Sequence, residues 1–260
     1  MSLMRLDVNE VGLATLTRKE VKRFWSVLGQ TVTAPVMTAL LYLLVFGQVM
    51  QGRVEVYPGV SYTQFLIPGL IVMSVIQNAF ANSSSSLIQS KLLGNLVFVL
   101  MAPIAAWELF AAYLGAGLLR AGLVGVVLYC ATWPFVQLPI HSLPELIGMF
   151  LLSGGSLAVI GLIAGIVASK FDHLASFQNF LILPASFLSG VFYSIHSLPE
   201  FWYRVSQFNP FFYMIDGFRH GFLGVGDVPV WLCFAWTGGF FVVLSTVCLW
   251  MLTTGYKLRP

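Results

Sequence analysis

The chain has 260 residues, of which 58% are hydrophobic and only 9% are charged, with a formal net charge of +3. A soluble domain carries about 25% charged residues, so this composition excludes a soluble globular protein. The small net charge gives no reason to expect a nucleic-acid partner.

Six apolar segments are each long enough to cross a bilayer, because a hydrocarbon core about 30 Å thick needs about 20 helical residues. They cover residues 27–49, 65–83, 107–129, 145–167, 179–195 and 230–252. Each run is continuous, whereas barrel strands alternate over about ten residues. The sequence therefore predicts an all-α polytopic membrane protein with six transmembrane helices. We expect a single domain over residues 1–260, with an interfacial segment at 1–26, a bundle at 27–252 and a tail at 253–260.

Lysine and arginine fall unevenly on the two sides of these spans. If the N-terminus is inside, the inner side holds Arg5, Arg18, Lys19, Lys22, Arg23, Lys91, Lys170, Lys257 and Arg259. The outer side then holds only Arg53, Arg204 and Arg219. Cytoplasmic loops are enriched in Lys and Arg, so both termini are predicted to be cytoplasmic.

The segment before the first span has the pattern of a helix lying in the membrane interface. Val21, Phe24, Trp25 and Leu28 recur at helical spacing, while Lys19, Lys22 and Arg23 take the other side. Separated apolar and basic faces are typical of an interfacial helix. The alternative is a basic flank that only anchors the first span.

Two cytoplasmic segments lie between spans. The run Asn82-Ser83-Ser84-Ser85-Ser86 is rich in N-cap residues and predicts a new surface helix over residues 87–101, with Lys91 and Asn95 on one face. The alternative is a simple extension of the spans. The second segment is the short loop 169–173, which contains Lys170 and Asp172.

The fifth span and the outer segment after it carry breakers and aromatic residues. Pro184 predicts a kink in the fifth span. In the outer segment 196–229, Asn209-Pro210 is a helix-start signal and Gly224 a stop. We expect two short amphipathic helices that dip back into the outer leaflet. The alternative is an ordinary outer loop with an aromatic belt.

Motifs for chemistry on this chain are missing. The sequence has no G-x-x-x-x-G-K-[ST] phosphate-binding loop, its four histidines are dispersed, and Cys130, Cys233 and Cys248 have no metal-binding spacing. Arg120 is the one charged residue deep in a span. Such residues usually face a bundle interior, a partner or a cavity, which predicts a place on a translocation path or a subunit interface. The alternative is a structural arginine satisfied by nearby carbonyls.

The chain resembles the membrane subunits of bacterial ABC-2-type exporters, most closely the YadH-like branch. Three segments carry this resemblance. They are Tyr62-Thr63-Gln64-Phe65-Leu66-Ile67-Pro68-Gly69-Leu70, Gly190-Val191-Phe192-Tyr193-Ser194 with Leu198-Pro199, and Asn209-Pro210-Phe211-Phe212-Tyr213-Met214-Ile215-Asp216-Gly217-Phe218-Arg219.

The resemblance implies a non-enzymatic permease in the bacterial inner membrane. It implies an assembly of two copies with two separate ATPase subunits, which would bind ATP and magnesium, so this chain itself needs no cofactor. Lys91, Asn95, Lys170 and Asp172 would then contact the ATPase, and Asn209, Pro210, Tyr213 and Arg219 would form the outer re-entrant signature. One departure is that Val97 and Phe98 stand where the family often has an acidic pair.

The substrate is not readable from the sequence: an amphipathic or lipid-like compound loosely suits the aromatic outer segment, and a drug or saccharide is also compatible with the family. Glycines 115, 117, 122 and 125 would let helices approach closely, either between two copies or within one subunit. A competing function is an ATP-independent channel or secondary transporter. Such a protein needs acidic residues within its spans, and here only Glu108 and Glu145 lie at span edges.

Overall fold

The computed structural model describes residues 9–50 and 56–258, and this part of the chain is helical. Residues 1–8 of the predicted interfacial segment, residues 51–55 with Arg53, and residues 259–260 of the predicted tail lie outside the described residues. The elements in chain order are α1 (Glu10–Trp25), α2 (Leu28–Met50), α3 (Tyr62–Leu92), α4 (Leu96–Met101), α5 (Ala106–Thr132), α6 (Leu143–Val167), α7 (Phe171–Phe177), the π-helix η1 (Gln178–Ile182), α8 (Leu183–Phe187), the 3₁₀ helix η2 (Ile195–Ser197), α9 (Glu200–Gln207), α10 (Pro210–Leu223) and α11 (Val230–Thr254).

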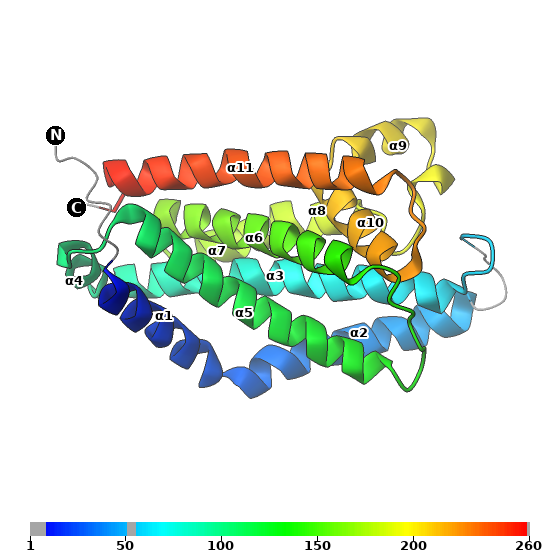
Figure 1. Ribbon diagram of the computed structural model, residues 1–260, viewed down its shortest axis with the longest axis horizontal. Coiled ribbons are helices and arrows are strands. Elements are labelled where there is room, and N and C mark those ends of the chain that lie inside the picture. The colour runs from blue at the N-terminus through cyan, green and yellow to red at the C-terminus, as the bar shows by residue number, and fades with distance from the viewer. Residues whose placement is uncertain (1–8, 51–55, 259–260) are drawn as a thin grey trace.

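Five of these helices, α2, α3, α5, α6 and α11, are long and apolar enough to cross a membrane. They run side by side along the longest axis of the molecule (Figure 1). Both described termini lie at one end, which we call the terminal end, and α9 and α10 lie at the opposite, distal end.

Helix α3 is the centre of the bundle. In its most apolar stretch 78% of the residues are buried, against 17% in α2 and in α11. It packs against α6, α5, α10 and α2, and its face toward α6 is close enough that a Cβ on Gly161 would lie 2.5 Å from the carbonyl oxygen of Phe80. Small residues permit such contacts between helices in lipid.

The glycines of the third predicted span pack mainly within the subunit. A Cβ at Gly117 or Gly125 would meet Ser83 or Val75 of α3, and one at Gly122 would meet Phe150 of α6. Only Gly115 has open space around it. Three of the four glycines therefore serve contacts within one copy, which is the alternative that the sequence left open.

The predicted helix start at the Asn82–Ser86 run is wrong. Helix α3 begins at its N-cap Ser61 and continues through this run to Leu92. The polar side chains need no helix boundary, because they find partners on α1: Arg23 donates to the Asn82 side chain and backbone, and Ser86 donates to Glu20. A separate short helix does follow, but it is only α4.

The fifth predicted span differs most from its expected bounds. A helical run begins at Phe171 and ends at Phe187, so it starts before and stops before the predicted segment 179–195. It contains the π-helix η1 directly before Pro184. Proline lacks an amide hydrogen and clashes with the carbonyl four residues earlier, and a wider π turn accommodates this.

The predicted faces of the N-terminal helix are wrong for one basic residue. Phe24 is buried, Trp25 is exposed, and Leu28 already belongs to α2. Arg23 points inward instead of toward the headgroups, because Asn82, Ser85 and Glu20 offer it acceptors there. Whether α1 lies in a membrane interface stays a prediction.

Candidate functional site

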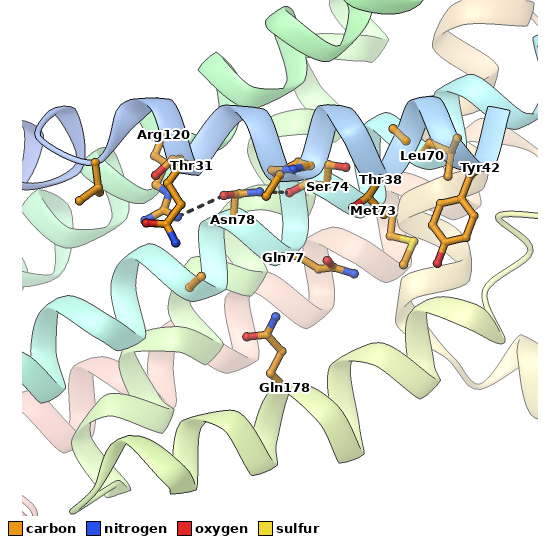
Figure 2. A pocket seen from close by; sticks show the side chains of 16 residues that line it. Thr31, Thr38, Tyr42, Leu70, Met73, Ser74, Gln77, Asn78, Arg120 and Gln178 are labelled. Carbon is orange, nitrogen blue, oxygen red and sulfur yellow. Dashed lines mark hydrogen bonds between the residues drawn. The ribbon is translucent and has the colours of Figure 1, made fainter. Parts of the chain in front are cut away.

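A groove of about 530 Å³ runs along one side of the bundle, between α2, α3, Arg120 of α5 and Gln178 of η1. Its lining alternates polar and apolar side chains (Figure 2). The polar members are Gln30, Thr31, Thr38, Tyr42, Ser74, Gln77, Asn78, Arg120 and Gln178. Among the described lining residues, Arg120 is the only charged one.

Helical spacing explains how these side chains come together. Thr31 and Thr38 lie two turns apart on α2, and Ser74, Gln77 and Asn78 lie within one turn of α3. Residues three and four apart share a helix face. Gln178 projects from the opposite wall toward α3 (Figure 2). The sequence analysis singled out Arg120 but missed these neutral polar residues, whose signal was amide and hydroxyl side chains at helical spacing inside apolar runs.

Arg120 meets the groove without an acidic partner. Its Nη2 donates to the Asn78 Oδ1 at 3.3 Å, and the Asn78 Nδ2 donates to the Ser74 carbonyl at 3.0 Å. Its Nε is buried and has no hydrogen-bond partner in the described part of the chain. The Gln77 Nε2 is also buried without a partner. The groove therefore holds a cation and an amide donor whose hydrogen-bonding capacity is unused.

Arg120 marks one end of the groove, which we call the polar end, whereas Thr38 and the Tyr42 hydroxyl keep the opposite end partly polar (Figure 2). Arg120, Thr31 and Asn78 lie together at one end, while Tyr42, Leu70 and Met73 lie at the other (Figure 2). From Val27 to Tyr42 it follows α2 for about 22 Å, at about 1.5 Å per residue. The polar end is next to the α1–α2 junction, because Thr31 lies in the first turn of α2.

At the terminal end, a buried ionic cluster fixes α1 to α3. Glu20 is fully buried and accepts from Ser86 and from the Arg23 Nε at 3.3 Å, and the Lys19 Nζ lies 3.5 Å from it. The sequence analysis missed Glu20. Its signal was its place between Leu16 and Phe24 at steps of four, on the apolar face of α1.

The four residues predicted to contact an ATPase lie on adjoining segments at the terminal end. The Lys91 Nζ donates to the carbonyls of Ile166 and Ala168, each at 2.8 Å, which joins the end of α3 to the end of α6. Asn95, Lys170 and Asp172 are exposed. Lys91 and Asn95 do not share one helix, since α3 ends at Leu92 and α4 begins after Asn95.

Exposed apolar residues, which we call the α4 patch, lie on α4 and next to it in the chain, and the sequence analysis did not predict them. The patch consists of Leu92, Leu93, Val97, Phe98 and Met101, whose exposure ranges from 49% for Val97 to 69% for Phe98 and Met101. Val97 and Phe98 are the two residues noted as a departure. A large exposed apolar patch often marks an interaction surface.

At the distal end, Arg219 joins three segments. It is 1% exposed, its Nη2 donates to the Gly190 carbonyl at 2.8 Å, and its guanidinium carbon lies 3.8 Å from the centre of the Phe65 ring. Its Nη1 lies 3.6 Å from Asp216. These contacts tie α10 to the start of α3 and to the segment around Gly190. Asp216 was missed, although its i, i+3 spacing to Arg219 is a signal.

Asp227 is a second organiser at the distal end. It accepts from the Tyr57 hydroxyl at 2.8 Å, the Ser194 hydroxyl at 2.6 Å and the Ile195 amide at 3.0 Å. Its own amide donates to Asp216 at 2.9 Å. Burial raises the pKa of the Tyr57 hydroxyl, so this group remains a donor. No local sequence pattern predicted Asp227, because its partners come from three distant segments.

The predicted helix start at Asn209-Pro210 is confirmed. The Asn209 side chain accepts from the Phe211 amide at 3.0 Å, and Gly224 ends α10 in the left-handed conformation with φ of 71°. The Asn209 Nδ2 also donates to the Ala185 carbonyl at 2.7 Å, and Tyr213 stacks on Trp236 at 5.2 Å between ring centres. Whether α9 and α10 return into a membrane stays a prediction.

The chain is similar to known transport proteins. Residues 12–223 match the ABC-2 type transporter family. The inner membrane transport permease YadH of Escherichia coli K12 is 37% identical over 249 residues, which cover 96% of this chain and 97% of that protein. Nodulation protein J of Rhizobium leguminosarum bv. trifolii is 30% identical, covering 74% of this chain and 73% of that protein.

Proposed function

The chain belongs to the ABC-2 type transporter family and is a membrane transport permease, and from this premise we propose that it is the membrane subunit of an ATP-driven exporter. Two copies would assemble with two copies of a separate ATPase subunit, which binds ATP and magnesium. The permease itself would carry no catalytic residue and no cofactor.

The proposed topology has six crossings, with residues 1–260 as one domain in the bacterial inner membrane. Five crossings are the long helices, and the sixth is the run from Phe171 to Phe187. This run is about 25 Å long at about 1.5 Å per residue, slightly less than the hydrocarbon core. The terminal end would face the cytoplasm, where Lys and Arg concentrate, and α9 and α10 would return into the outer leaflet.

The polar groove carries this proposal. Thr38 and Gln30 are exposed on α2, and Gln178 is half-buried on the facing wall. Polar side chains that face lipid are costly, and they usually turn toward a bundle interior or a water-filled cavity. A second copy that covers the open side would enclose these side chains, so we place the translocation path between the two copies, with Arg120 in its wall.

The competing function, an ATP-independent channel or secondary transporter, needs a titratable acid on the path. No carboxylate is among the described residues that line the groove. Glu108, one of the two acids near span edges, instead accepts from the amides of Asn9 and Ala105 at 2.6 and 2.7 Å. The lining of the groove therefore fits a permease powered by a separate ATPase better than a channel or secondary transporter.

For the ATPase contact we propose the exposed apolar patch on and around α4, together with Asn95, Lys170 and Asp172. Lys91 would act through position, because it holds the α4 segment beside the 169–173 loop. A push on α4 would then reach α3 and α6 together. Rigid packed helices transmit such displacements.

The dimer is tested by cysteine cross-linking in membranes. The exposed native Cys130 is first changed to Ser, while Cys233 and Cys248 are buried. Single Thr38→Cys and Gln178→Cys variants should form disulfide-linked or short-linker permease dimers. A matched Val242→Cys variant on the exposed face of α11, where Val242 is 61% exposed, should remain monomeric.

The assembly is tested by native mass spectrometry of the permease co-expressed with the ATPase from its neighbouring reading frame. Two permeases and two ATPases are expected. A complex with one permease copy would contradict the proposal, as would dimers that form at Val242 and not at the groove positions.

A further inference from the structure

We propose that the groove binds an anionic amphiphile, with its anionic group at Arg120 and its apolar part along Tyr42, Leu70 and Met73. This inference rests on the proposed function, in which the groove is the substrate path. It adds the chemical class of the substrate and the direction in which the substrate lies.

The first step is that Arg120 has no counter-charge. Its only hydrogen bond in the described chain is to the neutral Asn78 amide, and none of its nitrogens lies within 4.0 Å of a described carboxylate. An unpaired cation in a low-dielectric setting is costly. A bound anion would remove this cost.

Two buried acids of the bundle, Glu20 and Glu108, already have partners of their own. Glu20 is held by Ser86, Arg23 and Lys19, and Glu108 by two backbone amides. Neither can turn to Arg120 without breaking buried contacts, and such breaks cost several kcal/mol. These two carboxylates therefore supply no counter-charge to Arg120.

Other hydrogen-bond donors besides Arg120 line the groove. The Gln77 Nε2 is buried without a partner, and the amides of Gln30 and Gln178 and the hydroxyl of Thr31 also line the groove. Phosphate, sulfate and carboxylate groups accept several hydrogen bonds at once, and guanidinium groups bind them with two parallel donors. No described acidic side chain lines the groove to repel an anion.

The end of the groove away from Arg120 is more apolar. Leu70, Met73 and the ring of Tyr42 line the end away from Arg120, with Thr38 beside them (Figure 2). No charged residue of the described chain lines this end of the groove. Because the polar end is next to the α1–α2 junction, a lipid-like molecule would enter with its headgroup near the interface and its apolar part deeper in the membrane.

The test measures binding to the purified permease in the uncharged detergent dodecyl maltoside. Two labelled probes with equal chains are compared, dihexanoyl phosphatidic acid and dihexanoyl phosphatidylcholine, and inorganic phosphate is added as a competitor. We expect the phosphatidic acid to bind about tenfold or more tightly than the phosphatidylcholine. Inorganic phosphate alone should compete only weakly.

Variants assign the effect to the groove. Arg120→Gln should abolish the preference for the anionic probe, and Arg120→Lys should keep part of it because the charge remains. Arg204→Gln is the matched control, since Arg204 lies on the exposed α9 and its side chain is 71% exposed. That variant should bind both probes like the unmodified protein.

Several outcomes would overturn the inference. One is equal binding of the two probes, and another is an unchanged preference in Arg120→Gln. If phosphate alone displaces the probe as well as phosphatidic acid does, the site takes a small anion and the amphiphile is wrong.

If the Arg120→Gln variant does not fold, the Gln77→Leu variant tests the proposal instead. It should weaken phosphatidic acid binding severalfold without changing phosphatidylcholine binding, and unchanged binding of both would refute the idea. The assay needs neither the ATPase nor the dimer, so its failure is distinct from failure of the cross-linking test.

Discussion

The guanidinium carbon of Arg219 lies over the ring of Phe65, 3.8 Å from its centre, although 153 residues separate the two along the chain. The contact joins the start of α3 to α10, and the Gly190 carbonyl and Asp216 complete the surroundings of the cation. The outer part of the bundle is thus organised by one buried arginine.

Removal of Arg219 should therefore strongly destabilise the protein. Arg219→Leu leaves the buried Asp216 carboxylate with its backbone donors but without a cation, and breaking such a buried pair costs about 3–5 kcal/mol. The midpoint of thermal unfolding in detergent measures the loss. The control is Arg204→Leu, whose exposed pair with Glu200 contributes less than about 1 kcal/mol. Equal effects of the two variants would show that Arg219 does not have this role.

A glycine pair tests the close approach of α3 and α6. Gly161→Ala should cost about 1–3 kcal/mol, because its Cβ would lie 2.5 Å from the Phe80 backbone oxygen and one helix must shift. Gly115→Ala meets nothing within 4 Å and should instead stabilise α5 by about 0.5–1 kcal/mol. Unfolding midpoints of the two variants should therefore move in opposite directions, and a tolerated Gly161→Ala would contradict the packing.

The buried Glu20 should determine how firmly α1 is held. Glu20→Gln removes the charge that Arg23 and Lys19 face, and hydrogen bonds to charged groups contribute about 1.5–3 kcal/mol. Amide hydrogen exchange in α1 should then speed up by more than about tenfold, while exchange in α3 stays slow. Lys22→Gln changes an exposed charge on the same helix and should leave the exchange unchanged. Uniform acceleration in all helices would indicate global destabilisation instead.

Exposed residues of the α4 patch and of the 169–173 loop should map the contact with the ATPase. Phe98→Cys, Lys170→Cys and Asp172→Cys, each in the Cys130→Ser background, should cross-link to the co-expressed ATPase. Phe201→Cys on α9 should not, although Phe201 is equally exposed at 69%. Labelling of Phe98→Cys by an impermeant reagent added from the periplasm would overturn the proposed orientation.

Phe98→Ser should also weaken ATPase binding without altering the thermal unfolding of the permease alone, because the side chain is exposed in the isolated subunit. The control is Phe201→Ser on the distal α9, where Phe201 is equally exposed, and it should bind the ATPase like the unmodified protein. Pull-down of the ATPase as a function of salt measures this. An apolar contact should persist at high salt, whereas an ionic contact would weaken.

Most of the helices could be predicted from composition and local signals. Long apolar runs require helices in lipid, since every backbone donor must be satisfied within the segment. Asn209, Pro210 and Gly224 bounded α10 correctly, because caps and stops depend on a few neighbouring residues.

Local signals failed where a distant segment supplied the partner. The Asn82–Ser86 run looked like a helix start, but it lies inside a continuous helix, where Arg23 of α1 donates to Asn82 and Ser86 donates to Glu20 of α1. The predicted bounds of the fifth span, 179–195, were also wrong. The π-helix η1 lets the helical run continue past Pro184, and the residue at which this run ends depends on packing.

The sequence by itself determined the solvent, the helical class and the prominence of Arg120, because each follows from composition or from one charge in an apolar run. Only the tertiary structure decided what Arg120 faces. The amides and hydroxyls of the groove come from α2, α3 and η1, and their convergence depends on the packing of helices that are far apart in the chain. Hydrophobic periodicity places a residue on a helix face, but it does not select the helix that packs against that face.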